Sequence, residues 1–205
     1  MALSSTIDRS HTDVGSRRMT GGDALAEMLI ANGVDTIFGL PGVQLDGLFN
    51  ALWSRQDQLR VIHTRHEQAT AYMADGYARV SGKEGVCVVV PGPGLLNAAA
   101  AISTAYACNS PVLCVTGQIR SALIDHGRGM LHEIHDQVGM IRHITKSAER
   151  AVVPSEVPGL VNRAFAALRE GRIRPVEIEV PLDTLFAEAD VEIPADIPVR
   201  EYVSP

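Results

Sequence analysis

Short apolar runs alternate along this chain with segments in which apolar residues recur at helical spacing. The clearest run covers residues 85–90, is rich in valine and ends at Pro91-Gly92. Continuous runs of this kind are typical of parallel strands that are buried on both faces. The pattern predicts strands at 36–40, 59–62, 85–90, 112–116, 145–153 and 175–180, and helices at 20–32, 45–53, 69–79, 95–106 and 157–169.

This alternation indicates an α/β fold, with an open parallel sheet of about six strands and helices on both faces. Thr20 and Asp23 have the spacing of a capping box, so ordered structure is expected to begin there. Residues 1–19 are polar and lack a hydrophobic period, which predicts a disordered arm. Residues 187–205 are acidic and punctuated by proline, which predicts a linker and leaves 20–186 as the folded domain.

Composition narrows the class of protein. The chain has 205 residues and a net charge of −6, which suits one domain and argues against a nucleic-acid or acidic-membrane partner. No apolar run approaches the ~20 residues that span a bilayer. Cys87 and Cys114 lie within predicted strands, and the three cysteines lack metal-ligand spacing. Buried free thiols suit a reducing compartment, so a cytoplasmic location is expected.

Loops that follow predicted strands carry most of the candidate chemistry. They are Pro41-Gly42-Val43-Gln44, Arg65-His66-Glu67-Gln68, Pro91 to Asn97, and the long segment from Gly117 to Gln137. In a parallel sheet these loops meet at the carboxyl edge, where ligands bind. Glu67 is the only acid in the first three loops. It either has a ligand-binding role or only stabilises the positive end of a helix dipole.

Gly92-Pro93-Gly94 with Asn97 is close to the fingerprint of dinucleotide-binding folds, because it follows a strand and opens a helix. However, Asn97 stands where the third glycine is expected, and the next strand ends in Val115-Thr116 without an acid that could bind a ribose. A dinucleotide oxidoreductase and a purely structural turn therefore stay as alternatives. The long loop contains His132, Glu133, His135 and Asp136, for which a polar loop is favoured over the alternative of a metal site, so no metal ligands are assigned.

Several short motifs follow one another in a characteristic order. They are Phe38–Gly42, Thr64–Ala69 with Ala74–Arg79, Gly92–Asn97, Ser110–Pro111–Val112 leading to Thr116–Gln118, Ile144–Lys146, and Arg174–Val176 leading to Val180–Asp183. Together they resemble the amino-terminal, pyrimidine-binding domain of thiamine-diphosphate-dependent enzymes, such as acetolactate synthase, benzaldehyde lyase and 2-oxo-acid decarboxylases. The resemblance covers residues 20–186. It implies the thiamine-diphosphate-binding fold and a decarboxylase or carboligase that acts on a 2-oxo acid.

The resemblance also implies roles for single residues. Glu67 matches the family's catalytic glutamate, which hydrogen-bonds the aminopyrimidine ring of the cofactor and promotes loss of its thiazolium proton. The implied cofactor-binding residues are Pro41, Gly42, Glu67, Pro93, Gly94 and Asn97. The substrate candidates are Val43, Gln118, His132 and Glu133.

The loop of residues 127–137 departs from the acetolactate-synthase pattern. It looks more like the loops of decarboxylases for longer or guanidino-bearing 2-oxo acids. His132 and Glu133 in this loop either contact the substrate or form hydrogen bonds within the loop. The sequence therefore leaves open which 2-oxo acid is used, and whether the reaction is decarboxylation or carboligation.

The chain lacks the Gly-Asp-Gly signature with which the family holds magnesium and diphosphate. The resemblance therefore implies that a separate domain, on another chain, anchors thiamine diphosphate through Mg²⁺, and that residues 187–205 lead to an absent middle domain. It further implies that the complete protein is a homo-oligomer and that this chain alone is inactive. The alternative is a non-catalytic binding or regulatory module of the same fold.

Overall fold

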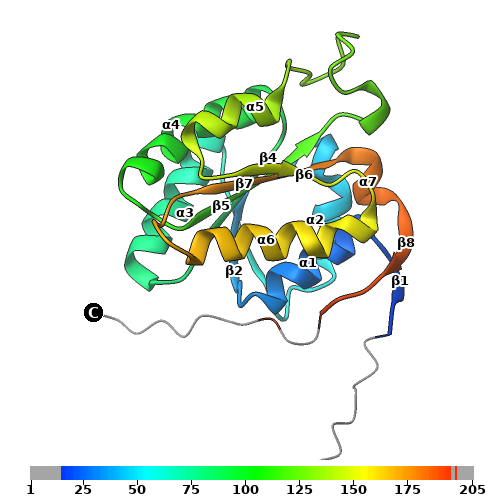
Figure 1. The fold of residues 1–205 in the computed structure, drawn as a ribbon, viewed down its shortest axis with the longest axis horizontal. Coiled ribbons are helices and arrows are strands. Elements are labelled where there is room, and N and C mark those ends of the chain that lie inside the picture. The colour runs from blue at the N-terminus through cyan, green and yellow to red at the C-terminus, as the bar shows by residue number, and fades with distance from the viewer. Residues whose placement is uncertain (1–14, 195–196, 198–205) are drawn as a thin grey trace, which may run out of the picture.

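The computed structural model describes residues 15–194 and residue 197. A six-stranded parallel sheet forms the centre of the domain, with the strand order β3-β2-β4-β5-β7-β6 (Figure 1). Its strands are β2 (Thr36–Gly39), β3 (Arg60–His63), β4 (Gly85–Val89), β5 (Val112–Gln118), β6 (Ala148–Arg150) and β7 (Val176–Pro181). The predicted α/β class with a parallel sheet is confirmed.

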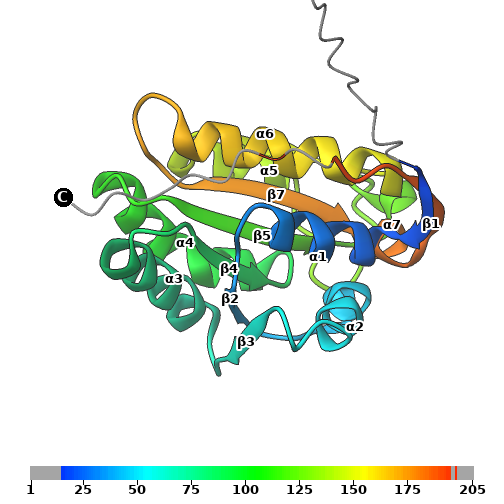
Figure 2. The same ribbon diagram turned by 90° about the horizontal axis from the view of Figure 1, so that it is seen from below.

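Helices cover both faces of the sheet, as Figure 2 shows from a second direction. They are α1 (Gly21–Ala31), α2 (Asp46–Trp53), α3 (Glu67–Ser81), α4 (Pro93–Ala107), α5 (Gln137–Ile141), α6 (Val157–Arg169) and α7 (Leu182–Phe186). Helices α1, α2 and α6 contribute to the hydrophobic core on one face, and α3, α4 and α5 to the core on the other. The capping box is confirmed, because Asp23 N donates to Thr20 Oγ1 at 3.0 Å and Thr20 N donates to Asp23 Oδ2 at 3.4 Å.

Strand β4 shows how the sequence builds both cores at once. Val86 and Val88 are fully buried in the core on the α1–α6 face, and Cys87 and Val89 in the core on the α3–α4 face. Successive side chains of a strand point to opposite faces, so a strand that is covered on both sides needs apolar residues at every position. Cys87 and Cys114 are buried free thiols, as predicted.

The ends of the described domain differ from expectation. β1 (Arg17–Thr20) pairs antiparallel with β8 (Glu188–Val191), so residues 17–19 of the predicted arm and the start of the predicted linker form a two-stranded sheet. Met19 and Val191 are buried in the α1–α6 core, which stabilises this pairing. The strands are too short and too polar to show a hydrophobic period. The rest of the predicted arm (1–14) and the linker residues 195–196 and 198–205 lie outside the described residues.

The strand order places the sheet's topological switch point between β2 and β4. The chain runs from β2 outward to β3, then returns to β4 on the other side of β2 and continues to β5. The loops that leave β2 and β4 therefore diverge, and open α/β sheets bind ligands in the crevice between such loops. Across the part of the chain that the structure describes, no helix combines the length and apolar character needed to cross a lipid bilayer.

Candidate active site

Glu67 is the first residue of α3, close behind the end of β3. His66 is the N-cap residue in an extended conformation, and its Nδ1 accepts a hydrogen bond from Gln68 N at 3.2 Å. The carboxylate of Glu67 is half-buried and lies at the positive end of the helix dipole. A carboxylate at this position could either stabilise the helix or bind a ligand. The residues around Glu67 distinguish these two roles.

The first turn of α4 faces the Glu67 carboxylate. Asn97 Nδ2 donates a hydrogen bond to Glu67 Oε2 at 2.9 Å. A Cβ atom at Gly94 would lie 3.4 Å from Glu67 Oε1 and only 2.5 Å from Val90 Cγ2, so a side chain at this position would displace its surroundings. The glycine keeps the space beside Oε1 free. The structure therefore brings Glu67, Gly94 and Asn97 together, with Pro93 exposed at the start of the same helix.

The loop after β2 lies against the same strand end. A Cβ atom at Gly42 would lie 2.4 Å from Val90 Cγ1, so Gly42 and Gly94 approach opposite methyl groups of one valine at the end of β4. Pro41 is exposed and Val43 is 58% exposed in this loop. Because neither glycine has a side chain, the loops that follow β2 and β4 can both pack closely against Val90 at the switch point. Pro41 and Val43 leave apolar surface there for a ligand.

His132 reaches this edge from the long loop through Gln44. Gln44 Nε2 donates to Leu131 O at 3.1 Å, and Gln44 Oε1 lies 3.1 Å from His132 Nδ1. Because the amide N–H of Gln44 is directed at Leu131, its oxygen accepts, and Nδ1 of a neutral His132 carries the proton. Nε2 of His132 then keeps its lone pair for another partner. A Cβ atom at Gly92 would lie 2.3 Å from His132 O, so the loop packs directly on the Gly92 turn.

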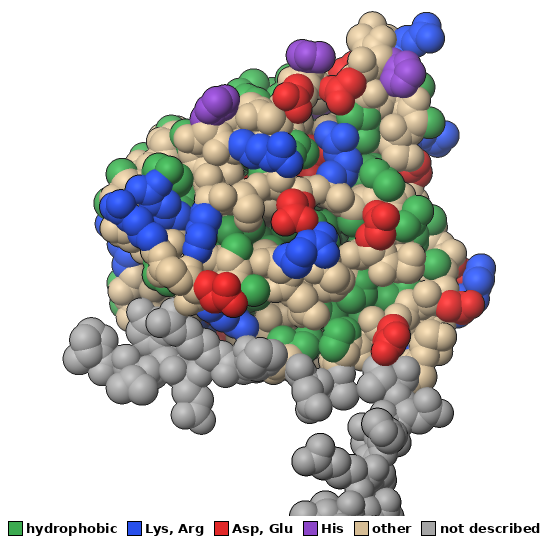
Figure 3. Space-filling view, viewed as in Figure 1, with side chains coloured by type: hydrophobic (Ala, Val, Ile, Leu, Met, Phe, Trp, Pro, Cys, Tyr) green, Lys and Arg blue, Asp and Glu red, His purple; other side chains and the backbone are tan. Residues whose placement is uncertain are grey.

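Glu133 forms hydrogen bonds within its own loop. Its carboxylate accepts from Arg128 N at 3.3 Å and from Met130 N at 2.9 Å. These backbone N–H groups, with Met130 first, lower the pKa of Glu133. In Figure 3, which has the view of Figure 1, histidine side chains lie along the upper rim, where Figure 1 places α5 and the loop before it.

Gln118 is placed differently from the other candidates. We expected its side chain to face the same edge as Glu67, but it is 2% exposed, and its Oε1 accepts from Ile119 N at 2.7 Å. The reason is that β5 continues to Gln118, past the predicted end at Thr116, and this strand is buried along its whole length. Gln118 therefore lies at the carboxyl end of β5, but its side chain is buried, and its role in substrate binding stays a prediction.

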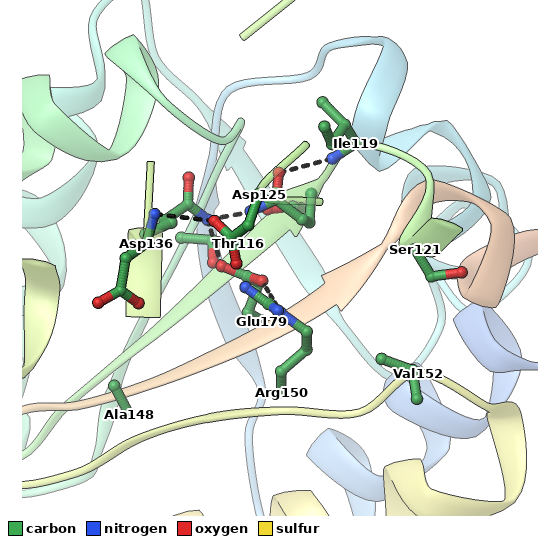
Figure 4. A network of polar contacts seen from close by, with 12 residues as sticks. Thr116, Ile119, Ser121, Asp125, Asp136, Ala148, Arg150, Val152 and Glu179 are labelled. Carbon is green, nitrogen blue, oxygen red and sulfur yellow. Dashed lines mark hydrogen bonds and ion pairs between the residues drawn. The ribbon is translucent and has the colours of Figure 1, made fainter. Parts of the chain in front are cut away.

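A buried polar network that the sequence analysis missed surrounds Glu179, Arg150 and Thr116 (Figure 4). Glu177 and Glu179 of β7 are both 0% exposed. Arg150 Nε donates to Glu179 Oε1, and Thr116 Oγ1 donates to Glu177 Oε1. Burial is the largest cause that raises the pKa of Glu179, while Arg150 opposes it. The pairing with Arg150 makes Glu179 the charged member of the two acids.

Glu177 is the neutral member. Burial raises the pKa of Glu177 well above its usual range, and the charge of Glu179 adds to the shift. Its Oε2 has no hydrogen-bond partner, which is far less costly for a protonated carboxyl than for a carboxylate. The two acids alternate with Val176, Ile178 and Val180 in β7. This alternation in an otherwise apolar strand was the signal available in the sequence.

An α/β domain with a carboxylate and two close-packed glycines at its switch point defines a ligand-binding domain of the open-sheet class. A family profile described as thiamine pyrophosphate enzyme, N-terminal TPP binding domain, matches residues 19–140. The chain therefore belongs to the thiamine pyrophosphate enzyme family and represents its N-terminal TPP-binding domain.

Relatives in this family are named as enzymes. The chain is 46% identical over 171 residues to a probable 2-ketoarginine decarboxylase of Pseudomonas aeruginosa, which covers 83% of this chain and 30% of the relative. It is 41% identical over 187 residues to a probable acetolactate synthase large subunit of Methanocaldococcus jannaschii, covering 90% of this chain and 31% of the relative. It is 36% identical over 169 residues to the mitochondrial acetolactate synthase catalytic subunit of Saccharomyces cerevisiae, covering 82% of this chain and 24% of the relative. The chain thus spans less than a third of the length of each of these relatives.

Proposed function

We propose that this chain supplies the activating glutamate, Glu67, to a thiamine-diphosphate-dependent enzyme that decarboxylates or condenses a 2-oxo acid. The observation that carries the proposal is the position of the Glu67 carboxylate. Asn97 fixes its Oε2 at 2.9 Å, and Gly94 leaves the space beside its Oε1 free. A carboxyl held in this way can exchange a hydrogen bond or a proton with a nitrogen heterocycle at the switch point.

The residues at the switch point fit the cofactor's pyrimidine ring. Gly42 and Gly94 carry no side chains that would stand between the two loops, so a flat ring could approach the backbone there, beside Glu67 Oε1. Thiamine diphosphate supplies an acidic carbon whose conjugate base adds to the carbonyl of a 2-oxo acid. Glu67 would hold the aminopyrimidine, while Pro41 and Val43 would exclude water from one side. We further propose that a separate domain holds the diphosphate and Mg²⁺.

A 2-oxo acid with a guanidino group is our preferred substrate. Its support is the relative named 2-ketoarginine decarboxylase, at 46% identity, together with the long loop. A pocket of about 400 Å³ in that loop is lined by two acids, Asp125 and Glu133. Carboxylates are the natural partners of a guanidinium. Turnover of 2-ketoarginine by the complete enzyme should exceed turnover of pyruvate, and the reverse order would contradict this assignment.

A neighbouring chain is the proposed partner of helices α3 and α4. Large apolar side chains are exposed on these helices: Tyr72, Met73, Val80 and Leu96, with Val80 90% exposed. Exposed apolar residues that cluster on neighbouring helices are typical of protein–protein interfaces. We propose that a cofactor-anchoring domain of another subunit covers part of this surface, which would complete the site beside Glu67 in a homo-oligomer.

The direct test is Glu67→Gln in the complete enzyme. Because the amide cannot exchange the proton, kcat should fall by about 10²- to 10⁴-fold, the usual contribution of a general acid or base. Glu149→Gln is the control, since Glu149 is also half-buried but lies in β6, away from the switch point, and pairs with Arg163 of α6. Near-normal turnover of the Glu67→Gln enzyme would contradict the proposed function.

Calorimetry discriminates the alternative of a non-catalytic module. The isolated chain should bind thiamine diphosphate with magnesium negligibly, whereas the same chain together with the missing domains should bind it tightly. Absence of binding in the presence of those domains would favour the regulatory module.

A further inference from the structure

Gln137 connects three separate parts of the sheet edge. It is the first residue of α5 and is 0% exposed. Its Oε1 accepts a hydrogen bond from Gly92 N at 2.7 Å. Its Nε2 donates to Glu179 Oε2 at 2.6 Å and to Gly117 O at 3.3 Å. The amide is therefore used on both sides, with the donor directed at the buried ion pair and the acceptor at the turn before α4.

The Gly92 turn depends on help from elsewhere in the chain. Gly92 is the N-cap of α4, and no side chain of its own caps the helix. Its φ of +56° lies in the left-handed region, and His132 O leaves no room for a Cβ atom. Since the first N–H groups of a helix lack intrahelical partners, Gln137 Oε1 supplies the acceptor that is missing at this end.

The position of the Gly92 turn sets the position of the first turns of α4, which border the candidate active site. Gly94 and Asn97 follow Gly92 within the first turns of α4, and both face the Glu67 carboxylate. A shift of the turn would therefore change the distance between Asn97 Nδ2 and Glu67 Oε2. The buried side chains of α4 are those of alanine, leucine and isoleucine, so the hydrogen bond from Gly92 N to Gln137 is a directed contact that holds the start of this helix.

The far end of the connection is a buried ion pair. Glu179 is 0% exposed and pairs with Arg150 on the neighbouring strand β6. A carboxylate that accepts from an amide N–H polarises that amide, and its oxygen becomes a stronger acceptor. The bond from Gly92 N to Gln137 Oε1 is thereby strengthened by the charge of Glu179, which points to the α3–α5 face because Val176, Ile178 and Val180 of the same strand point to the other face.

We propose that Gln137 is a positioning residue, which couples the buried Glu179–Arg150 ion pair to the first turn of α4 and so holds Asn97 against Glu67. The inference rests on the proposed function for its catalytic consequence. The contact itself can be tested in the chain alone.

Hydrogen exchange of the Gly92 amide, resolved by NMR on this chain, is the first test. In Gln137→Met, which keeps the volume but has no amide, exchange at Gly92 should be faster by about tenfold or more, the usual effect of losing one buried hydrogen bond. Thr184→Val is the matched control, because Thr184 is also buried and donates one hydrogen bond, to Val152 O at 2.7 Å in another part of the fold. It should leave Gly92 unchanged. If Gln137→Met does not fold, Gln137→Asn replaces it, since the shorter amide cannot reach both partners.

A double-mutant cycle in the complete enzyme is the second test. Gln137→Met and Asn97→Ala should each lower kcat by about tenfold with little change in KM, and the double variant should lose hardly more than either single variant. Additive losses would mean that Gln137 acts only through general stability, which overturns the positioning role. Thr184→Val combined with Asn97→Ala provides the additive reference.

The two failures can be told apart. Unchanged Gly92 exchange in the Gln137 variants would overturn this inference and leave the role of Glu67 untouched. Normal turnover of Glu67→Gln would remove the proposed function, while faster Gly92 exchange would still support the contact between Gln137 and the turn.

Discussion

Two groups of carboxyl side chains lie on either side of the Gly92 turn, and they differ in almost every physical respect. Glu67 is half-buried at the open edge, and Asn97 donates to one of its two oxygens. Glu177 and Glu179 are 0% exposed and contact Thr116, Arg150 and Gln137. Glu67 therefore keeps hydrogen-bonding capacity for a ligand, whereas the oxygens of Glu179 are used within the protein.

The contrast teaches that different carboxyl groups of this domain serve ligand binding and the stability of the fold. A buried charge that loses its partner is strongly destabilising, so the network around Glu179 should dominate the free energy of unfolding. A carboxylate at the edge has water as an alternative partner, so changes at Glu67 should hardly alter folding. The Gly92 turn, with Gln137 on one side and Asn97 on the other, connects the two groups.

The largest effect on stability is expected for Arg150→Met. This change leaves Glu179 buried without its cation, and the free energy of unfolding should fall by about 3–5 kcal/mol. Urea unfolding followed by circular dichroism measures it. Arg163→Met is the matched control, because Arg163 pairs with Glu149 at the exposed surface and should cost at most about 1 kcal/mol. Equal losses in the two variants would contradict the difference between buried and exposed pairs.

The pH dependence of unfolding is the second test. The pKa of Glu177 is raised in the folded protein, so the folded state binds a proton that the unfolded state releases. This contribution to stability is complete below the ordinary pKa of glutamate and is lost as the pH rises through the raised value. Relative to Glu177→Gln, the wild-type protein should therefore lose up to about 1.4 kcal/mol for each pH unit in that window.

Urea unfolding of the wild-type chain and of Glu177→Gln across about pH 5 to 8 measures this difference. Comparing the two chains cancels the contributions of groups that do not interact with Glu177, such as the lowered pKa values of Asp23 and Asp183, so that the difference reports the Glu177–Glu179 pair. Parallel curves would mean that Glu177 is charged in the folded protein and would remove the distinction between the two buried acids.

The smallest effect is expected for Asn97→Ala. The alanine cannot donate to Glu67 Oε2, so kcat of the complete enzyme should fall by about tenfold, which corresponds to about 1.4 kcal/mol. The free energy of unfolding of the chain should change little, because Asn97 is exposed. Ser103→Ala on the same helix is the control, since Ser103 bonds only to Ala100 O at 2.8 Å. If Asn97→Ala lowered the free energy of unfolding but not kcat, the open edge would serve stability instead of catalysis, which contradicts the comparison with the buried acids.

Local signals in the sequence were sufficient to predict the sheet and the open edge of the site. The valine run of β4 and the glycine-proline turn after it predicted a buried strand and a helix start, and the structure has both. Thr20 and Asp23 predicted the start of α1. Glu67, Gly94 and Asn97 were nominated together, and the structure places them within contact of one another. The strand, the turn and the helix start depend on residues that are close in sequence, whereas Glu67 was grouped with Gly94 and Asn97 through the family resemblance.

The remaining features depend on contacts between distant residues. Gln137 contacts Gly92 and Glu179, and neither contact has a signature in a single sequence. The end of β5 was placed two residues too early, at Thr116 instead of Gln118, and strand ends are the least certain part of a pattern. The pairing of Arg17–Thr20 with Glu188–Val191 joins residues from the two ends of the described chain, which no periodicity reveals.

That pairing has a practical consequence. Because β1 and β8 lie side by side, the first and last strands of the domain adjoin, and Ile193 just beyond β8 still packs against the core (Figure 1). A domain whose ends adjoin can be inserted into a surface loop of another protein, or circularly permuted, without rerouting the chain. For protein engineers, this domain can therefore be inserted into another protein as one unit, with the positions of Gly42, Gly94 and Glu67 relative to one another unchanged.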